Sequence, residues 1–132
     1  MGLRSASPAN AAADLSAVQW DNRVLVLFAE AGDERYGEQQ NLLNAVRDGL
    51  AERDMLVLGV TGQSVATLFG NLASFDVDAV RRTAGRNSAE PFEVVLIGKD
   101  GGVKKRWTMP VSPEALFTII DAMPMRANEM RR

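Results

Sequence analysis

The residue types that carry most covalent enzyme chemistry are missing from this chain. Its 132 residues include no cysteine and no histidine. Their absence excludes disulfides, thiol nucleophiles, zinc sites built from Cys and His, and triads with an imidazole base. Carboxylates are plentiful, but no pair has a spacing that predicts a shared site, so two-carboxylate or metal-assisted hydrolysis is unsupported. We therefore expect no catalytic residue, no metal site and no cofactor.

The best candidate for ligand binding is a short polar run between a predicted strand and a predicted helix. Ligands of open α/β folds bind where strands end, and a helix N-terminus offers free N–H groups to an anion. The alternative is that Asp33 only caps the helix while Tyr36 packs on the core. Gln39, one turn further, faces either the same cleft or the solvent. The candidate binding residues in this region are Asp33, Glu34, Arg35, Tyr36 and Gln39.

Positive charge near the C-terminus is a second candidate. The net charge is −2, yet residues 99–132 carry seven basic and four acidic side chains. A basic surface there would bind phosphate, an acidic partner or matrix or envelope polymers. The alternative is solvated charge, with Arg126 paired to an acid or to a helix carbonyl end. No global basic field would attract nucleic acid, so we expect none to bind. The candidate basic surface is Lys104, Lys105, Arg106 and Arg126.

Hydrophobic periodicity predicts the elements that position these residues. Strands are expected over residues 23–29, 55–60, 92–98 and 103–109. Helices are expected over residues 33–53, 76–84 and 112–123, with Pro124 as a stop. Residues 61–75 fit either a helix or a hairpin. A strand–helix–strand unit makes the first two strands parallel, and the turn at 99–102 makes the last two a hairpin. The simplest arrangement is a thioredoxin-like α/β fold: a four-stranded mixed sheet of order 2-1-3-4 with helices on both faces.

The same patterns predict one domain over residues 15–132, preceded by a flexible tail over residues 1–14. No apolar run approaches the about 20 residues of a transmembrane helix. The tripeptide at 9–11 (Ala-Asn-Ala) resembles the end of a signal cleavage region. If an upstream signal was removed, we expect a periplasmic or secreted protein, and otherwise a cytoplasmic one. The oligomeric state stays open.

Several motifs resemble a thioredoxin-like family of unknown function, sometimes called P-DUDES. The resemblance covers approximately residues 15–132, and Met-Pro-Met-Arg at 123–126 is its most specific part. The family has stand-alone bacterial members and relatives in vertebrate sushi-repeat and secreted matrix proteins. The motifs that carry the resemblance are Trp20, Asn22-Arg23, residues 24–29, Gln39, Arg53-Asp54, residues 96–104 (LIGKDGGVK), residues 120–126 (IDAMPMR) and Glu129-Met130-Arg131.

The resemblance implies a fold without its usual chemistry. Thioredoxins carry Cys-x-x-Cys after the first core strand, where this chain has Glu30–Tyr36. Neither Ser nor Asp replaces a thiolate nucleophile. Pro91 matches the cis-proline of thioredoxins, so we expect a cis peptide bond before it and add it to the candidate binding residues. We expect a non-catalytic binding or structural module that takes a protein or peptide partner between Asp33–Tyr36 and Pro91. The alternative is a peroxiredoxin-like or thiol-disulfide oxidoreductase that needs a partner thiol or a cofactor.

Overall fold

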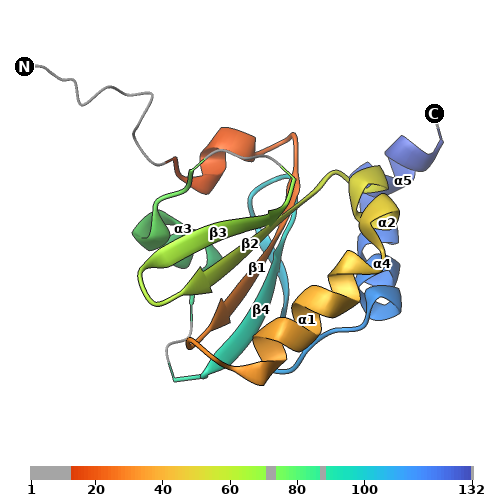
Figure 1. The fold of residues 1–132 in the computed structure, drawn as a ribbon. Helices are drawn as coiled ribbons and strands as arrows, with labels where there is room; N and C mark the ends of the chain where they lie inside the picture. The colour runs from red at the N-terminus through yellow and green to blue at the C-terminus, as the bar shows by residue number, and fades with distance from the viewer. Residues whose placement is uncertain (1–12, 71–73, 87–88, 132) are drawn as a thin grey trace, which may run out of the picture.

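A computed structural model describes residues 13–70, 74–86 and 89–131 (Figure 1). Of the predicted tail, residues 1–12 lie outside the described residues. The strands are β1 (Arg23–Ala29), β2 (Met55–Thr61), β3 (Ser64–Phe69), β4 (Phe92–Ile97) and β5 (Val103–Trp107). The helices are η2 (Leu15–Val18, a 3-10 helix), α1 (Glu34–Asn44), α2 (Arg47–Glu52), α3 (Val77–Ala84), α4 (Pro113–Asp121) and α5 (Pro124–Met130). No helix in the described ranges is long and apolar enough to span a bilayer.

The five strands form one mixed sheet of order β3-β2-β1-β4-β5. Strand β1 is parallel to β2 and antiparallel to β4, and β5 is antiparallel to β4. The predicted thioredoxin-like order is therefore confirmed in its four core strands, β2-β1-β4-β5. The fifth strand, β3, forms a hairpin with β2. Its tight turn places Gly62 at φ 59, a conformation that glycine adopts without steric cost. Of residues 61–75, the stretch 71–73 lies outside the described part of the chain.

The core lies on both faces of the sheet because β1, β2 and β4 are buried on both sides. Alternate residues of β1 point to opposite faces. Val24, Val26 and Phe28 pack with residues of η2 and α3 on one face. Leu25 and Leu27 pack with residues of α1, α2 and α4 on the other. Figure 1 shows these two helical layers on either side of the strands, which confirms helices on both faces.

Two predicted boundaries are wrong. The helix expected over 33–53 is broken at Val46, whose φ of −130° and ψ of 35° lie outside the helical region. The break divides it into α1 and α2, and the strand expected over 103–109 ends at Trp107. The predicted stop at Pro124 is confirmed, since α4 ends at Asp121 before it, but the sequence prediction missed α5, in which Pro124 occupies the first turn. Met123 takes the extended conformation that a following proline favours, and α5 begins immediately after it.

Candidate functional site

The polar run after β1 forms a capped helix start. The Asp33 carboxylate accepts hydrogen bonds from the backbone N–H of Arg35 at 2.9 Å and from its guanidinium at 3.0 and 2.8 Å. These bonds hold the pKa of Asp33 below its ordinary value. The guanidinium of Arg35 also lies 5.1 Å from the centre of the Phe92 ring. Glu34 is exposed in the first turn of α1. The structure thus bears out the capping role expected of Asp33.

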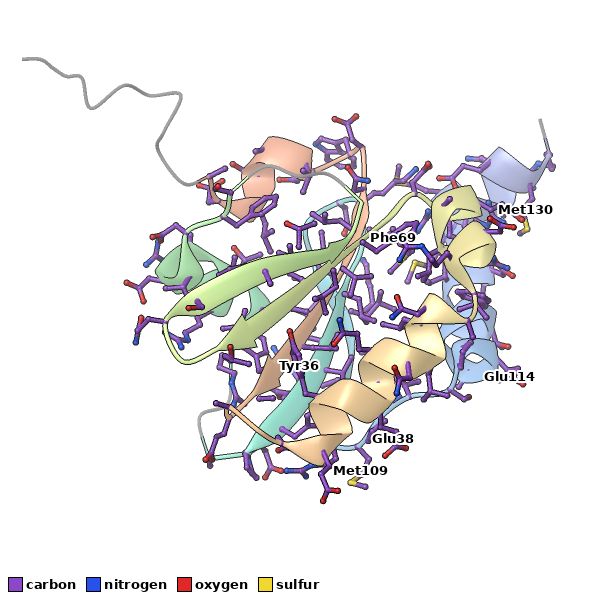
Figure 2. The ribbon with its side chains drawn as sticks, viewed as in Figure 1. Tyr36, Glu38, Phe69, Met109, Glu114 and Met130 are labelled. Atoms are coloured by element: carbon purple, nitrogen blue, oxygen red, sulfur yellow. The ribbon has the colours of Figure 1, made fainter. Side chains whose placement is uncertain are left out.

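Tyr36 and Gln39 are packing residues. Figure 2 shows the Tyr36 side chain between α1 and the sheet. A Cβ added to Gly59 in β2 would lie 2.8 Å from Cζ of Tyr36, so the ring lies directly over this glycine. Burial raises the pKa of the Tyr36 hydroxyl. Gln39 is fully buried. It donates to the carbonyl of Val111 at 3.0 Å and accepts from its N–H at 2.8 Å. Both expected positions of Gln39, in the cleft or in solvent, are therefore wrong.

An open groove of about 710 Å³ lies at the carboxyl end of β1. We call it the Pro91 groove. It is lined by Glu30, Gln63, Arg81, Arg82, Gly85, Arg86, Glu90 and Pro91. Asp33, Glu34, Tyr36 and Gln39 are not among its lining residues. Arg35 feels the charges of two residues that line it. Asp33 raises the pKa of Arg35 most, and Glu90 and Glu30 add to this effect. The structure thus places two of the predicted residues, Arg35 and Pro91, at one end of the sheet.

The peptide bond that precedes Pro91 is trans, because the described residues contain no cis peptide bond. The expected cis bond is therefore wrong. The trans form is the ordinary state of bonds that precede proline, and only about 5–6% of them are cis in folded proteins. The position of Pro91 before β4 agrees with the resemblance to thioredoxins, while its peptide geometry does not.

The predicted basic residues divide between the surface and the interior. Lys104, Lys105 and Arg106 are exposed on the edge strand β5. There Lys104 pairs with Asp100 at 2.8 Å. Arg126 is only 3% exposed, so its assignment to a basic surface is wrong. The alternative expectation, pairing with an acid, is correct. Arg126 contacts Asp121 at 3.0 Å, and it also contacts Glu52.

Arg126 belongs to a cluster of charges that we call the ion network, in which buried and half-buried cations pair with half-buried and exposed carboxylates. Its members are the cations Arg23, Arg53, Lys99 and Arg126 and the anions Glu52, Asp54, Asp121 and Glu129. Glu129 lies at its centre and accepts from the two terminal guanidinium nitrogens of Arg23, at 3.2 and 3.1 Å, and from Lys99 at 2.8 Å. Lys99 is only 8% exposed, so the general alternative that the basic residues of the C-terminal part are solvated charges does not hold for it.

Glu129 makes the stability of the fold depend on pH. Burial raises the pKa of Glu129, but the bonds from Arg23 and Lys99 outweigh it and lower the pKa from 4.5 to about 2. Its stabilising contribution is therefore complete above pH 4.5 and is lost as the pH falls through about 2.

We expect the Glu129→Gln variant to lose less stability than the wild type between about pH 5 and 2, because the glutamine binds no proton there. Urea unfolding at steps of pH measures both slopes. Equal slopes for the two proteins would contradict this assignment of the titrating group.

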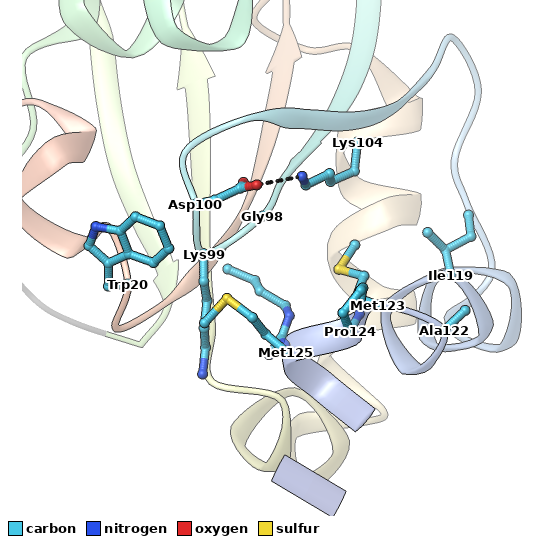
Figure 3. A pocket seen from close by; sticks show the side chains of 11 residues that line it. Trp20, Gly98, Lys99, Asp100, Lys104, Ile119, Ala122, Met123, Pro124 and Met125 are labelled. Carbon is cyan, nitrogen blue, oxygen red and sulfur yellow. Dashed lines mark hydrogen bonds and ion pairs between the residues drawn. The ribbon is translucent and has the colours of Figure 1, made fainter. Parts of the chain in front are cut away.

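A second open groove, of about 620 Å³, lies at the opposite end of the sheet (Figure 3). Arg23 at the start of β1 and Gly98 after β4 contribute to it, whereas the Pro91 groove meets the other ends of these strands. We call it the Trp20 groove. It is lined by Trp20, Arg23, Gly98, Lys99, Asp100, Lys104, Ile119, Ala122, Met123, Pro124 and Met125. The sequence prediction missed this site, although Trp20 and Met-Pro-Met-Arg both belong to the motifs of the family resemblance.

Comparison with known proteins identifies the family. The model of the family described as Domain of unknown function (DUF4174) matches residues 14–129. The chain belongs to this family. Coiled-coil domain-containing protein 80 of Danio rerio is 30% identical over 134 residues, which cover 88% of this chain and 15% of that protein. Sushi repeat-containing protein SRPX2 of Rattus norvegicus is 29% identical over 114 residues, 83% of this chain and 24% of that protein. The expected resemblance to a family with sushi-repeat relatives is therefore confirmed.

The DUF4174 chain spans about a seventh to a quarter of the length of the curated relatives that it matches. Human SRPX2 is 30% identical over 103 residues, which cover 75% of the chain and 22% of that protein. Among solved structures, the chain is similar to the crystal structure of Trgpx in its apo form. That comparison gives a TM-score of 0.49 and 20% identity, and it covers 91% of this chain and 87% of that one.

Proposed function

We propose that this DUF4174 domain is a non-catalytic binding module that takes a segment of a partner protein in the Pro91 groove. The supporting observation is the structure at the carboxyl end of β1, where thioredoxins carry their reactive thiols. There the chain has a helix start closed by the Asp33–Arg35 ion pair, and an open groove lies nearby. Its volume of about 710 Å³ is within the usual size range of ligand sites. The domain therefore offers a place for a partner without the thiol nucleophile of thioredoxins.

The charges of the groove favour a polar partner segment. Glu30 and Glu90 lie on the side of the strand ends, and Arg82 lies on α3. Arg81 is bound to the carbonyl of Gly62, and Arg86 pairs with Glu93 at 3.4 Å. A segment that carries both signs of charge complements these residues. Such complementarity selects partners more strongly than it raises affinity.

A redox-associated oxidoreductase that uses a partner thiol or a cofactor is the alternative function. Purified protein should not accelerate the reduction of a hydroperoxide or of insulin disulfides, with or without added glutathione. Turnover by the protein alone would overturn the proposal. Turnover that requires glutathione would favour the alternative, in which two molecules of glutathione reduce the hydroperoxide to alcohol and water and become glutathione disulfide.

Binding is tested with a random peptide library displayed on phage and selected on the immobilised chain. We expect the Arg82→Glu and Glu90→Lys variants to weaken the selected peptides by about tenfold, since reversing a charge within an interface creates like-charge contacts. Lys105→Glu on β5 is the control, because Lys105 does not line the groove. It should change affinity less than about twofold, as expected of a charge outside the interface. Absence of binders, or equal loss in all three variants, would show that the groove does not bind peptides.

A further inference from the structure

We propose that the Trp20 groove is a second binding site, for a protein segment that presents a large apolar side chain beside a carboxylate. This site is separate from the Pro91 groove, because the two lie at opposite ends of β1 and β4. None of its lining residues is shared with the Pro91 groove. The two proposals can therefore fail independently.

Trp20 is the first observation that indicates an apolar ligand. Its side chain is 60% exposed. Its φ of 75° lies in the left-handed region, where a bulky residue is strained. A hydrogen bond of 2.6 Å from its N–H to the carbonyl of Lys99 holds this conformation. Because the indole is exposed in the isolated chain, its burial does not offset the backbone strain. A molecule that covered the ring would supply that burial. Residues held in this way are concentrated at ligand sites.

The opposite wall of the groove is apolar and adaptable. Figure 3 shows Trp20 on one side and Ile119 on the other, with Met123 and Met125 between them. Met125 is 38% exposed, and Pro124 next to it is exposed as well. Methionine side chains are flexible and polarisable, so they fit apolar groups of different shapes. A tryptophan facing methionines is suited to a leucine or phenylalanine side chain of a partner.

The charged residues of the groove indicate that an acid lies beside the apolar group. Lys104 is the cation of this groove that a partner can reach, because Arg23 and Lys99 also line it but are buried and already paired with Glu129 and Asp54. The Lys104–Asp100 pair is exposed, at 35% and 47% of the two side chains. Exposed ion pairs contribute little, so Lys104 can exchange Asp100 for a partner carboxylate at small cost.

A protein segment fits this groove better than a small amphipathic acid does. Sites for small molecules usually enclose most of the ligand surface. The Trp20 groove is partly open to solvent, so part of whatever binds in it stays uncovered. A side chain anchored on Trp20 and Met125, with its backbone running past Lys104, uses both the apolar wall and the cation.

The probes are two peptides with blocked ends, Gly-Leu-Phe-Asp-Asp and Gly-Leu-Phe-Lys-Lys, together with dodecanoate. Nuclear magnetic resonance of the indole N–H of Trp20 and the methyl group of Met125 reports occupancy. We expect the acidic peptide to shift both signals and to bind at least about fivefold more tightly than the basic peptide, the range of one or two exposed charge contacts. Neither the Arg82→Glu nor the Glu90→Lys variant should change this binding.

Two matched pairs of variants locate the site. Lys104→Glu should remove the preference for the acidic peptide, whereas Lys105→Glu on the same strand should retain it. Met125→Ala should weaken binding by about threefold to tenfold, as expected for lost apolar contact. Met130→Ala is the control, because Met130 is exposed on the same helix outside the groove. Equal effects within either pair would overturn the assignment.

Other outcomes also overturn the proposal. Equal binding of the two peptides would show that the carboxylate plays no role. Binding of neither peptide would show that the groove is not a peptide site. Binding of dodecanoate alone would assign the groove to small amphipathic acids. Shifts of the Trp20 signal that depend on protein concentration without any ligand would assign it to contact between two copies of the chain.

Discussion

Replacing Glu129 with glutamine is expected to lower the free energy of unfolding by about 3 kcal/mol, the cost of leaving a buried charge without its partner. Glu129 is 16% exposed and accepts hydrogen bonds from Arg23, which is 1% exposed, and from Lys99, which is 8% exposed. Glutamine keeps the shape of the side chain but removes the negative charge. The two cations would then remain in the interior with less compensation. Urea unfolding at neutral pH measures the difference.

Glu38→Gln is the control for this experiment, because Glu38 is an exposed glutamate on α1. A substitution at such a surface position usually changes the free energy of unfolding by less than about 0.5 kcal/mol. If Glu129→Gln cost less than about 1 kcal/mol, the ion network would be no more important than exposed ion pairs.

The Gln39→Leu variant is expected to lose about 2–4 kcal/mol, because it leaves two buried backbone groups without partners and each costs about 1–3 kcal/mol. Gln39 satisfies both the N–H and the carbonyl of Val111, which is itself buried. Leucine has a similar volume but makes neither bond. The variant should therefore loosen the segment before α4, which hydrogen exchange at Val111 would detect together with a lower unfolding midpoint.

Gln40→Leu is the matched control at the neighbouring position. Within the described structure Gln40 is half-buried and its side chain makes no hydrogen bond. Its replacement should change stability by less than about 0.5 kcal/mol. Equal losses of stability for the two variants would show that the two hydrogen bonds of the Gln39 amide do not stabilise the fold.

The sheet could be predicted from the sequence because its physical signal is local. Strands β1, β2 and β4 are continuous apolar runs, and such runs indicate strands that are covered on both faces. Capping by Asp33 could also be predicted, and its side chain does bond to the backbone N–H of Arg35. Asp76 and Ser112 cap their helices in the same way, each through a backbone N–H three residues later. Strand β3 was ambiguous because its half-buried residues fit both the helical and the alternating pattern.

The burial of Arg23 and Gln39 could not be predicted, because their partners are far away in the sequence. Arg23 and Glu129 are 106 residues apart, and Gln39 and Val111 are 72 apart. A charged or amide side chain read alone indicates solvent exposure, since burial without a partner is costly. Only the fold brings the partners together. The Trp20 groove was missed for the same reason, as its walls come from the chain before β1, the β4–β5 turn and α4–α5.

Helix α5 is attached to the rest of the fold in an unusual way. Arg126 is the one buried residue among its seven, and it contacts Glu52, Asp121 and Glu129. Apolar surfaces can pack together in many orientations, but a guanidinium and a carboxylate form paired hydrogen bonds in only a few geometries. The ion pairs of Arg126 therefore restrict the orientation of α5 on the rest of the fold more than apolar packing would. One wall of the Trp20 groove consequently has an orientation set by ion pairs, while its surface is formed by the flexible side chains of Met123 and Met125.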